Sequence, residues 1–305
     1  MKPKMTKKQE EILKLIYTYR YLNRIQIQTL MNHKDKKTIN MWLKDLTEKN
    51  YINRIYSDHF LEKTKPAIYY LGINGIRQLK TLTQETVDDA GKVTYTPTYP
   101  IEELRKRYRE HERSQGFIDR SILVAQCCID LRSKAMVSNT LEYYRYTQAD
   151  YIDEACGFHF LSEHETIRPS LCTIKQEQTK QARQSTQDDQ TEEAATRTNY
   201  LLEIFDSTLP RYRVKKRIKD YVQYLIDDEW DSGDNDPPPI ILLVMPTLVD
   251  LIYAKRRTKK LLIDEYYETE DIPEDLHIRF TTTEQLKQNG VTANIWEERR
   301  KLYSV

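Results

Sequence analysis

The stretch KDKKTINMWLKDL, residues 34–46, decides the fold of the N-terminal region. Its apolar residues recur at helical spacing and line one face of a predicted helix: Ile39, Trp42, Leu43 and Leu46. Asp35 stands just before this helix, where its carboxylate can accept hydrogen bonds from the free amides of the first turn. The spacing therefore predicts an amphipathic helix over residues 36–50.

The opposite face of this helix is basic and carries an amide. The candidate DNA-contacting residues are Lys36, Lys37, Thr38, Asn40 and Lys44. An apolar back and a basic front suit a helix that lies in the major groove of duplex DNA. Asn40 is the best candidate for a base contact, because its amide can bond bidentately to adenine. The lysines are better suited to hold phosphates.

The surrounding sequence predicts a winged helix-turn-helix domain over residues 1–80. The expected elements are helices at 6–21 and 24–31, the recognition helix at 36–50, strands at 51–56 and 67–71, and a closing helix at 72–79. The two strands would form the wing. Its basic side chains are candidates for phosphate or minor-groove contacts: Arg54, His59, Lys63 and Lys65.

Charge is distributed unevenly along the chain, whose 305 residues predict about two domains. Residues 1–80 hold 17 Lys and Arg against 7 Asp and Glu, whereas the remainder holds 31 against 40. A basic first domain beside an acidic second one indicates that the first binds a polyanion; a solvated basic face without a partner is the alternative.

No run of 18 apolar residues occurs, so we expect a cytoplasmic protein without membrane association.

Residues 81–100 are predicted to be a linker, because they are rich in Thr, contain Gly91, Pro97 and Pro100, and show little periodicity. Residues 101–305 predict an α/β domain, which makes the whole chain a two-domain protein of mixed α+β and α/β class. The expected elements are one long helix at 101–131 or two helices joined near Gly116, strands at 141–146, 168–174, 200–205, 240–245 and 276–280, helices after Pro210 and at 248–262, and a short helix from Thr283. Residues 175–198 are glutamine-rich, which predicts a solvent-exposed polar insert, either disordered or an isolated helix.

This order of elements resembles the restriction-endonuclease-like core of the PD-(D/E)xK nucleases. In that family an Asp follows Pro on the second strand, an acid on the third strand precedes a Lys by two residues, and the carboxylates hold a divalent metal ion. Pro169 and Glu203 match the pattern, whereas Ser170 stands in place of the Asp and Phe205 in place of the Lys. Substitutes for the missing groups would be Glu142, Glu110 or Glu112, and Lys216 or Lys219.

Both halves together are similar to the replication-relaxation proteins of bacterial plasmids and integrative elements. The resemblance is carried by YYLGINGIRQL at 69–79, RPS at 168–170, YLLEIFDST at 200–208 and VKKRIKDY at 214–221. Phe205 and Ser207 depart from the acid and the Gly of that family's third strand, and Ser170 departs from its Asp. The resemblance implies a role in plasmid replication, in DNA relaxation or in its control, with duplex DNA and replication or mobile-element proteins as partners.

The altered motif predicts a nuclease-like domain that is inactive and needs no cofactor, because one remaining carboxylate binds Mg²⁺ poorly. Two alternatives stay open. An active Mg²⁺-dependent nickase or endonuclease would use Glu203 as the metal ligand together with Glu142 and Lys216. A winged-helix transcriptional repressor would use the second domain to form a homodimer or to bind an effector. The six histidines contain no pair separated by one hydrophobic residue, which argues against a rolling-circle relaxase of the HUH type.

Overall fold

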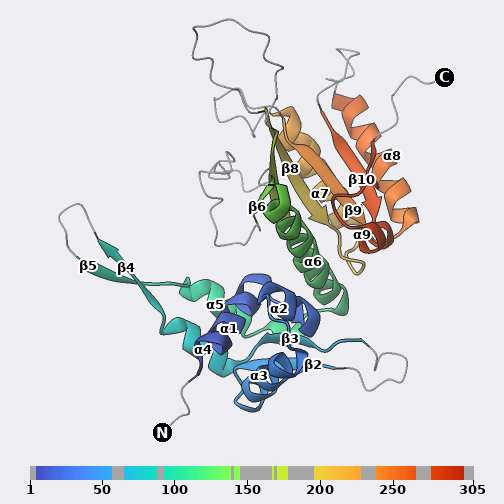
Figure 1. The fold of residues 1–305 in the computed structure, drawn as a ribbon. Helices are drawn as coiled ribbons and strands as arrows, with labels where there is room; N and C mark the ends of the chain where they lie inside the picture. Colours follow the sequence, from blue (N-terminus) through green and yellow to red (C-terminus); the bar gives the residue numbers. More distant parts are fainter. Residues whose placement is uncertain are drawn as a thin grey trace, which may run out of the picture. The chain divides into compact units, whose positions relative to one another are not determined.

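The computed structural model describes residues 5–56, 65–87, 93–138, 141–144, 167, 170–177, 196–227, 238–265 and 276–298 (Figure 1). They form a mixture of helices and sheets that divides into two units, residues 1–129 and residues 130–305. The long helix α6 (Gln115–Ser138) begins in the first unit and ends in the second. None of the described helices is both long enough and apolar enough to cross a membrane.

The first unit begins with the elements that the sequence predicts around residues 34–46. They are α1 (Lys7–Tyr19), β1 (Leu22–Asn23), α2 (Arg24–Leu30), α3 (Lys36–Glu48), β2 (Ile52–Ile55), β3 (Ile68–Leu71) and α4 (Ile73–Lys80). The strands form one antiparallel sheet in the order β1-β3-β2, in which Arg54 lies opposite Tyr69. Three helices followed by a hairpin, with a short strand added between the first two helices, is the element order of a winged helix-turn-helix.

Side-chain caps set where the first helices begin. Capping boxes begin α1, with Thr6 and Gln9, and α2, with Asn23 and Gln26. In each box the side chain of the cap residue accepts the backbone amide of the third helical residue, whose own side chain accepts the backbone amide of the cap residue. Helices α1, α2 and α3 bury their apolar faces against one another, and this burial is the main source of their stabilisation. The fully buried side chains are Ile12, Leu13, Ile16, Ile27, Ile39, Leu43 and Leu46.

Helix α4 lies directly against the backbone that follows α3. The amide of Gly72 donates to the carbonyl oxygen of Tyr51 at 2.9 Å, and the amide of Asn74 donates to that of Asn50 at 3.0 Å. A Cβ atom at Gly75 would lie 2.1 Å from the Tyr51 carbonyl oxygen, and one at Gly72 would lie 2.5 Å from that of Asn50. Glycine is therefore required at both positions, because no side chain fits between the two backbones.

Most of residues 81–100, which the sequence predicts to be a linker with little periodicity, forms a β hairpin. β4 (Thr83–Val87) pairs antiparallel with β5 (Val93–Pro97), and Figure 1 shows this hairpin extending away from the helices of the first unit. The two strands, TQETV and VTYTP, are rich in the β-branched residues that extended backbone favours. The Thr and Val residues of this stretch were therefore as compatible with strands as with a linker.

The division between the units lies near residue 129, and not at the predicted boundary of residues 81–100. α5 (Ile101–Arg107), the 3-10 helix η1 (Glu110–Glu112) and the first turns of α6 belong to the first unit. The Gln26 side-chain amide on α2 donates to the carbonyl oxygen of Ile122 on α6 at 2.9 Å. Contacts of this kind, between residues about a hundred positions apart, carry no signal in the local sequence pattern.

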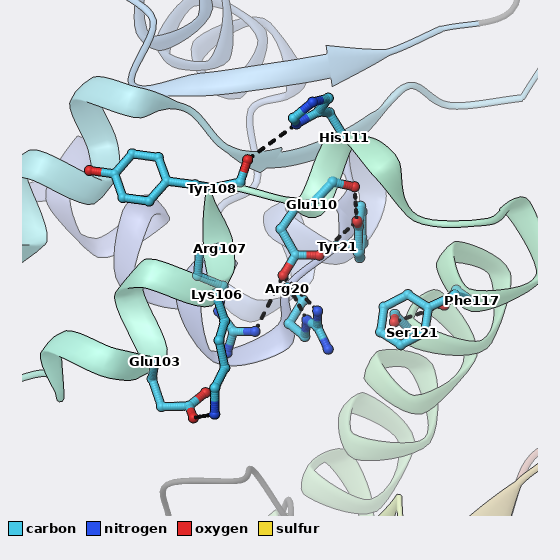
Figure 2. A network of polar contacts seen from close by, with 10 residues as sticks. All are labelled: Arg20, Tyr21, Glu103, Lys106, Arg107, Tyr108, Glu110, His111, Phe117 and Ser121. Atoms are coloured by element: carbon cyan, nitrogen blue, oxygen red, sulfur yellow. Dashed lines mark hydrogen bonds and ion pairs between the residues drawn. The ribbon is translucent and has the colours of Figure 1, made fainter.

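A buried polar cluster around Glu110 joins the end of α1 to the segment that contains α5, η1 and the start of α6 (Figure 2). The Glu110 carboxylate, fully buried, faces the guanidinium groups of Arg20 at 2.7 Å and Arg107 at 3.3 Å. The Tyr21 hydroxyl lies 2.7 Å from Oε2 of Glu110 and 2.6 Å from its backbone carbonyl oxygen, so two acceptors share one proton. Phe117, on α6, covers the cluster with its ring centroid 4.5 Å from the Arg20 guanidinium. The cluster attaches residues 101–117 to the end of α1.

The second unit is built on a six-stranded sheet with the order β11-β10-β9-β8-β7-β6. Its elements after α6 are β6 (Leu141–Tyr144), β7 (Leu171–Glu177), β8 (Thr196–Ile204), α7 (Arg211–Ile226), β9 (Ile240–Met245), α8 (Leu248–Glu265), β10 (Ile278–Thr282), α9 (Thr283–Asn289) and β11 (Glu297–Glu298). β8, β9 and β10 are parallel, and the other neighbouring strands are antiparallel. From β6 onward the predicted order of helices and strands is confirmed, with β11 as an addition, whereas the helical region predicted at 101–131 is divided into α5, η1 and α6.

Strands take up both ends of the predicted polar insert at residues 175–198. β7 continues to Glu177 and β8 already begins at Thr196, and the seven-residue register between them runs from Leu171 opposite Leu202 to Glu177 opposite Thr196. Cross-strand hydrogen bonding therefore orders polar residues that have no apolar pattern of their own. Residues 178–195 lie outside the described residues.

The core of the second unit lies between the parallel strands and the pair α7 and α8. Strand β9, predicted as buried on both faces from its unbroken apolar run, is buried along its whole length. The shared core contains Leu201, Phe205, Val214, Ile218, Tyr221, Val222, Leu225, Ile241, Leu243, Met245, Leu251, Ala254, Leu262, Ile278 and Phe280. Phe205, which stands at the position where the nuclease pattern would have a lysine, is one of these core residues.

Candidate functional sites

The outward face of α3 presents most of the side chains that the sequence predicts for DNA contact. Lys36, Lys37, Asn40 and Lys44 are exposed on the helix face opposite the buried Ile39, Leu43 and Leu46. Met41 lies among them and is 60% exposed. The only carboxylate exposed on α3 is Glu48 at its last residue, where it lies 3.7 Å from the Lys44 ammonium. The first two turns of α3 are therefore cationic on the outside.

Asp35 caps α3 as predicted. Its carboxylate accepts the amides of Lys37 at 2.9 Å and Thr38 at 3.0 Å, and the Thr38 hydroxyl donates to it at 2.5 Å. The hydroxyl of Thr38, followed by the two amides, holds the pKa of Asp35 below its ordinary value. Thr38 was predicted to contact DNA, but its hydroxyl proton is committed to the cap. Its role in the structure is to fix the start of α3.

Two further contacts hold α3 in place against its neighbours. The Asp45 carboxylate accepts from the Gln9 amide of α1 at 2.6 Å and from the Lys49 ammonium at 2.8 Å. These bonds, that of Lys49 first, lower the pKa of Asp45. Trp42, predicted to belong to the apolar face, is only half-buried and meets the His33 ring edge-on at 5.1 Å between centroids. The orientation of α3 is thus set by polar contacts as well as by its core face.

The wing contributes fewer cations than predicted, within the residues that the structure describes. Arg54 is exposed on β2, which packs against α3, and its guanidinium lies 5.4 Å from the Tyr56 ring. Lys65 is exposed just before β3. His59 and Lys63 lie outside the described residues. Arg54 therefore adds a cation on the strand that packs against α3, and Lys65 adds one at the described end of the hairpin.

A second polar centre surrounds Glu203 on β8. The carboxylate is fully buried beneath α7, where the Arg217 guanidinium donates to Oε1 in a short ion pair. Oε2 accepts from the Ser170 hydroxyl at 3.2 Å and lies 3.3 Å from the Tyr221 hydroxyl. The Ser170 oxygen in turn accepts the amide of Ile204 at 3.0 Å. Both carboxylate oxygens are therefore engaged by side chains of this unit.

The two positions that the nuclease resemblance aligns, Ser170 and Glu203, do come together in space. They are adjacent because β7 and β8 pair with Leu171 opposite Leu202, which puts the preceding and following residues side by side. The sequence pattern did not indicate the partners of Glu203 on α7. Arg217 and Tyr221 are one helical turn apart, so they project from the same side of α7 toward the sheet.

The structure separates the other predicted catalytic residues from Glu203. Glu142 lies opposite Ile174, four residues along β7 from Ser170 and so about 13 Å away along the strand. Lys216 is exposed, and the neighbouring Arg217 takes the inward position that a catalytic lysine would need. Glu110 belongs to the Arg20 cluster of the first unit, and Glu112 pairs with Arg109 on its surface. Within the described residues, the fold thus does not gather Glu142 and Lys216 around Glu203.

Metal ligands do not gather at this centre. No cluster of three or more His, Cys, Asp or Glu side chains able to hold a metal ion occurs among the described residues. Glu203 contributes one carboxylate where a Mg²⁺ ion needs several oxygen ligands, and a guanidinium already neutralises that carboxylate. The residues present do not fit the divalent metal of the PD-(D/E)xK nucleases.

Comparison with known proteins assigns no family to the chain. No family model and no curated protein matches it. Among solved structures, it is similar to the ferric uptake regulator (Fur) of Vibrio cholerae, whose crystal structure is described as revealing a structural rearrangement of the DNA-binding domains. The identity is 13%, the match covers 37% of this chain and 82% of that one, and the TM-score is 0.19. A TM-score this low leaves the function to be argued from the residues themselves.

Proposed function

We propose that this chain binds double-stranded DNA, with α3 in the major groove and the hairpin β2–β3 beside the phosphate backbone. The observation that carries the proposal is the outward face of α3, where Lys36, Lys37 and Lys44 surround the amide of Asn40. Lysine ammonium groups on flexible stems suit phosphates, and the amide suits the edge of an adenine. Helix α3 is attached to the rest of the domain through its core face and through the Asp45–Gln9 hydrogen bond. This attachment supports the proposed role, because a helix that recognises bases must hold its side chains in fixed positions.

Fluorescence anisotropy with labelled duplexes, measured over a series of KCl concentrations, tests this proposal. In the triple variant K36Q/K37Q/K44Q we expect the slope of log K against log [KCl] to become shallower by about 3, roughly one unit per lysine lost. The matched control is K7Q/K8Q/K14Q, which removes the same charge from α1. Equal slopes for the two triple variants would contradict a role for α3.

We infer further that the second unit does not cleave DNA by metal-dependent nuclease chemistry. The supporting observation is that Arg217 and Ser170 engage the one carboxylate at the aligned position, while Phe205 packs in the core. A buried carboxylate paired with a guanidinium contributes to the packing of α7 on the sheet rather than to metal binding. We therefore regard the second unit as a nuclease-like domain in which Ser170 and Phe205 stand where the nuclease pattern has its Asp and Lys.

Incubation of the purified chain with supercoiled plasmid, with Mg²⁺ or Mn²⁺ and with EDTA, tests this second inference. We expect the plasmid to remain supercoiled while its mobility shifts in native gels in a salt-sensitive way. Metal-dependent nicking that disappears in Glu203→Gln but persists in Glu284→Gln, an exposed position of α9, would overturn the inference.

The resemblance to the replication-relaxation proteins supports a more specific biological role. We propose that the chain acts in the replication or relaxation of a bacterial mobile element, or in the control of that process. A repressor of the winged-helix type is the rival proposal. Footprinting on the element's own DNA distinguishes the two, since a repressor dimer predicts a palindromic site that overlaps a promoter and a replication protein predicts a site at the origin.

A further inference from the structure

We propose that α7 and α8 form a second DNA-binding surface, on the other unit of the chain, which holds duplex phosphates without reading base sequence. The inference shares with the proposed function only the identity of the ligand. It concerns residues remote in the chain from α3 and separate from the buried centre of Glu203.

The charge of the second unit is concentrated at these helices. Residues 130–305 hold 24 Lys and Arg against 32 Asp and Glu, so the unit is acidic as a whole. Eleven of those 24 cations nevertheless lie in two short segments, residues 211–219 and 255–260, which contain no Asp or Glu. A solvated surface normally mixes both signs, whereas a one-sign patch in an acidic domain produces a local field that attracts a polyanion.

The fold places the two basic segments side by side. α7 connects β8 to β9 and α8 connects β9 to β10, and because these strands are parallel the two helices run in the same direction. The helices pack against each other (Figure 1), and the Arg211 guanidinium lies 5.7 Å from the centre of the Tyr253 ring. This contact aligns the start of α7 with the second turn of α8. The basic segments of both helices follow this contact in the same direction along the chain.

The cations of both segments point away from the core. On α7, the side chains of Val214, Ile218 and Tyr221 face the sheet, and Lys215, Lys216 and Lys219 are exposed. On α8, Leu251, Ala254 and Leu262 are buried, and Arg256, Lys259 and Lys260 are exposed. Among the described residues, no carboxylate forms an ion pair with any of these six cations, although Asp220, directly after the α7 segment, interacts electrostatically with Lys216 and Lys219. We refer to the six as the α7–α8 basic surface.

The chemistry of this surface favours the DNA backbone. Packed helix axes lie about 8–10 Å apart, and each basic segment is roughly 6–8 Å long. The cations are therefore spaced like neighbouring phosphates on one or both strands of a DNA duplex. Five of the six cations are lysines, which act as point charges toward phosphate. Neither segment contains an Asn or Gln that could read a base. The exposed aliphatic residues of α8, which are Leu248, Val249, Ile252 and Ile263, lie before and after the basic segment 255–260, and the exposed apolar side chain within the basic segments is Tyr212. The cations therefore do not alternate with a continuous apolar face, so an anionic membrane is the less suitable partner.

The test uses the full chain and four variants that each remove three positive charges. The variants are K215Q/K216Q/K219Q on α7, R256Q/K259Q/K260Q on α8, K36Q/K37Q/K44Q on α3, and the control K7Q/K8Q/K14Q on α1. Binding to a duplex of about 30 base pairs and random sequence is measured by anisotropy over a range of KCl concentrations. Circular dichroism verifies that each variant is folded.

We expect the α7 and α8 variants to bind the random duplex about tenfold or more weakly than the control near 0.15 M KCl, with slopes shallower by about 1 per lost phosphate contact. Normal binding by both variants, with weakened binding by the α3 variant, would overturn this inference and leave the proposed function intact. Weakened binding by the α7 and α8 variants alone would instead overturn the role of α3. The inference also fails if the α7 and α8 substitutions leave DNA binding unchanged but abolish binding to phosphatidylserine vesicles, because the surface would then serve a membrane.

Discussion

Arg20 and Glu110 lie ninety residues apart in the chain and form a two-point ion pair, with Nη2 and Nε of Arg20 at 2.7 Å and 2.9 Å from Oε1 of Glu110. Arg20 has a φ of 67° and a ψ of −53°, and the Tyr21 amide donates to the Tyr19 carbonyl oxygen at 2.8 Å. This is the geometry of a γ-turn, a strained conformation for a residue other than glycine that costs about 1–3 kcal/mol. The ion pair holds this residue in place at the end of α1.

Removal of the Glu110 charge should therefore destabilise the first unit. Glu110→Gln keeps the shape of the side chain but leaves the guanidinium groups of Arg20 and Arg107 buried without a counter-charge. Burial already lowers the pKa of Arg20 below its ordinary value. We expect a loss of about 3–5 kcal/mol in the free energy of unfolding, measured by urea titration followed by circular dichroism. Glu112→Gln, at an exposed pair with Arg109, is the control and should cost less than about 1 kcal/mol. Equal midpoints would show that the cluster contributes nothing.

Gly75→Ala tests the close approach of α4 to the backbone at Tyr51. The added methyl group would lie 2.1 Å from a backbone carbonyl oxygen, so one of the two segments must move. Alanine normally stabilises a helix relative to glycine, yet here we expect a loss of about 1–3 kcal/mol or more. Differential scanning calorimetry gives the comparison with Arg77→Ala, an exposed position of the same helix, which should change stability by no more than about 0.5 kcal/mol. A Gly75→Ala variant as stable as the parent would contradict the described packing.

Asn40→Ala and Lys44→Gln should weaken DNA binding in different ways. If Asn40 contacts a base, its removal costs about 1–3 kcal/mol of discrimination at one base pair and leaves the salt dependence unchanged. Loss of Lys44 should weaken binding to all sequences alike and reduce the salt slope by about 1. Selection from a randomised duplex library followed by anisotropy separates these outcomes. Unchanged base preferences in Asn40→Ala would rule out the predicted base contact.

Asp220→Asn should stabilise the second unit at neutral pH. Burial raises the pKa of Asp220 above its ordinary value of 3.8, although Lys216, Lys219 and Arg217 oppose the shift. An acid whose pKa is higher in the folded state costs stability when ionised, and this cost disappears as the pH falls through the folded-state pKa. We therefore expect a higher Tm for the variant at pH 7 and no such gain at pH 3. Asp264→Asn, at an exposed position of α8, is the control. A lower Tm at pH 7 would show that the Asp220 charge is stabilising.

Local sequence patterns were sufficient to predict the helices of residues 1–80 and the strands β2 and β3, but not the short strand β1. The apolar spacing of residues 39–46, the caps at Thr6 and Asp35 and the unbroken apolar run of β9 all depend on residues within about two helical turns of one another. Such signals survive in a single sequence because the physical interactions that produce them are local. The order of helices and strands in the second unit followed from the same kind of evidence.

Only the tertiary structure decided which distant residues meet. Glu110 was a candidate substitute in a nuclease centre, but it lies with Arg20 in the first unit, which extends to residue 129. Glu203 was a candidate metal ligand, but it is paired with Arg217 on a helix that begins seven residues after β8 ends. The charge and identity of these residues were visible in the sequence. Their partners depend on strand register and helix packing, because a buried carboxylate is neutralised by whichever cation the completed fold places beside it.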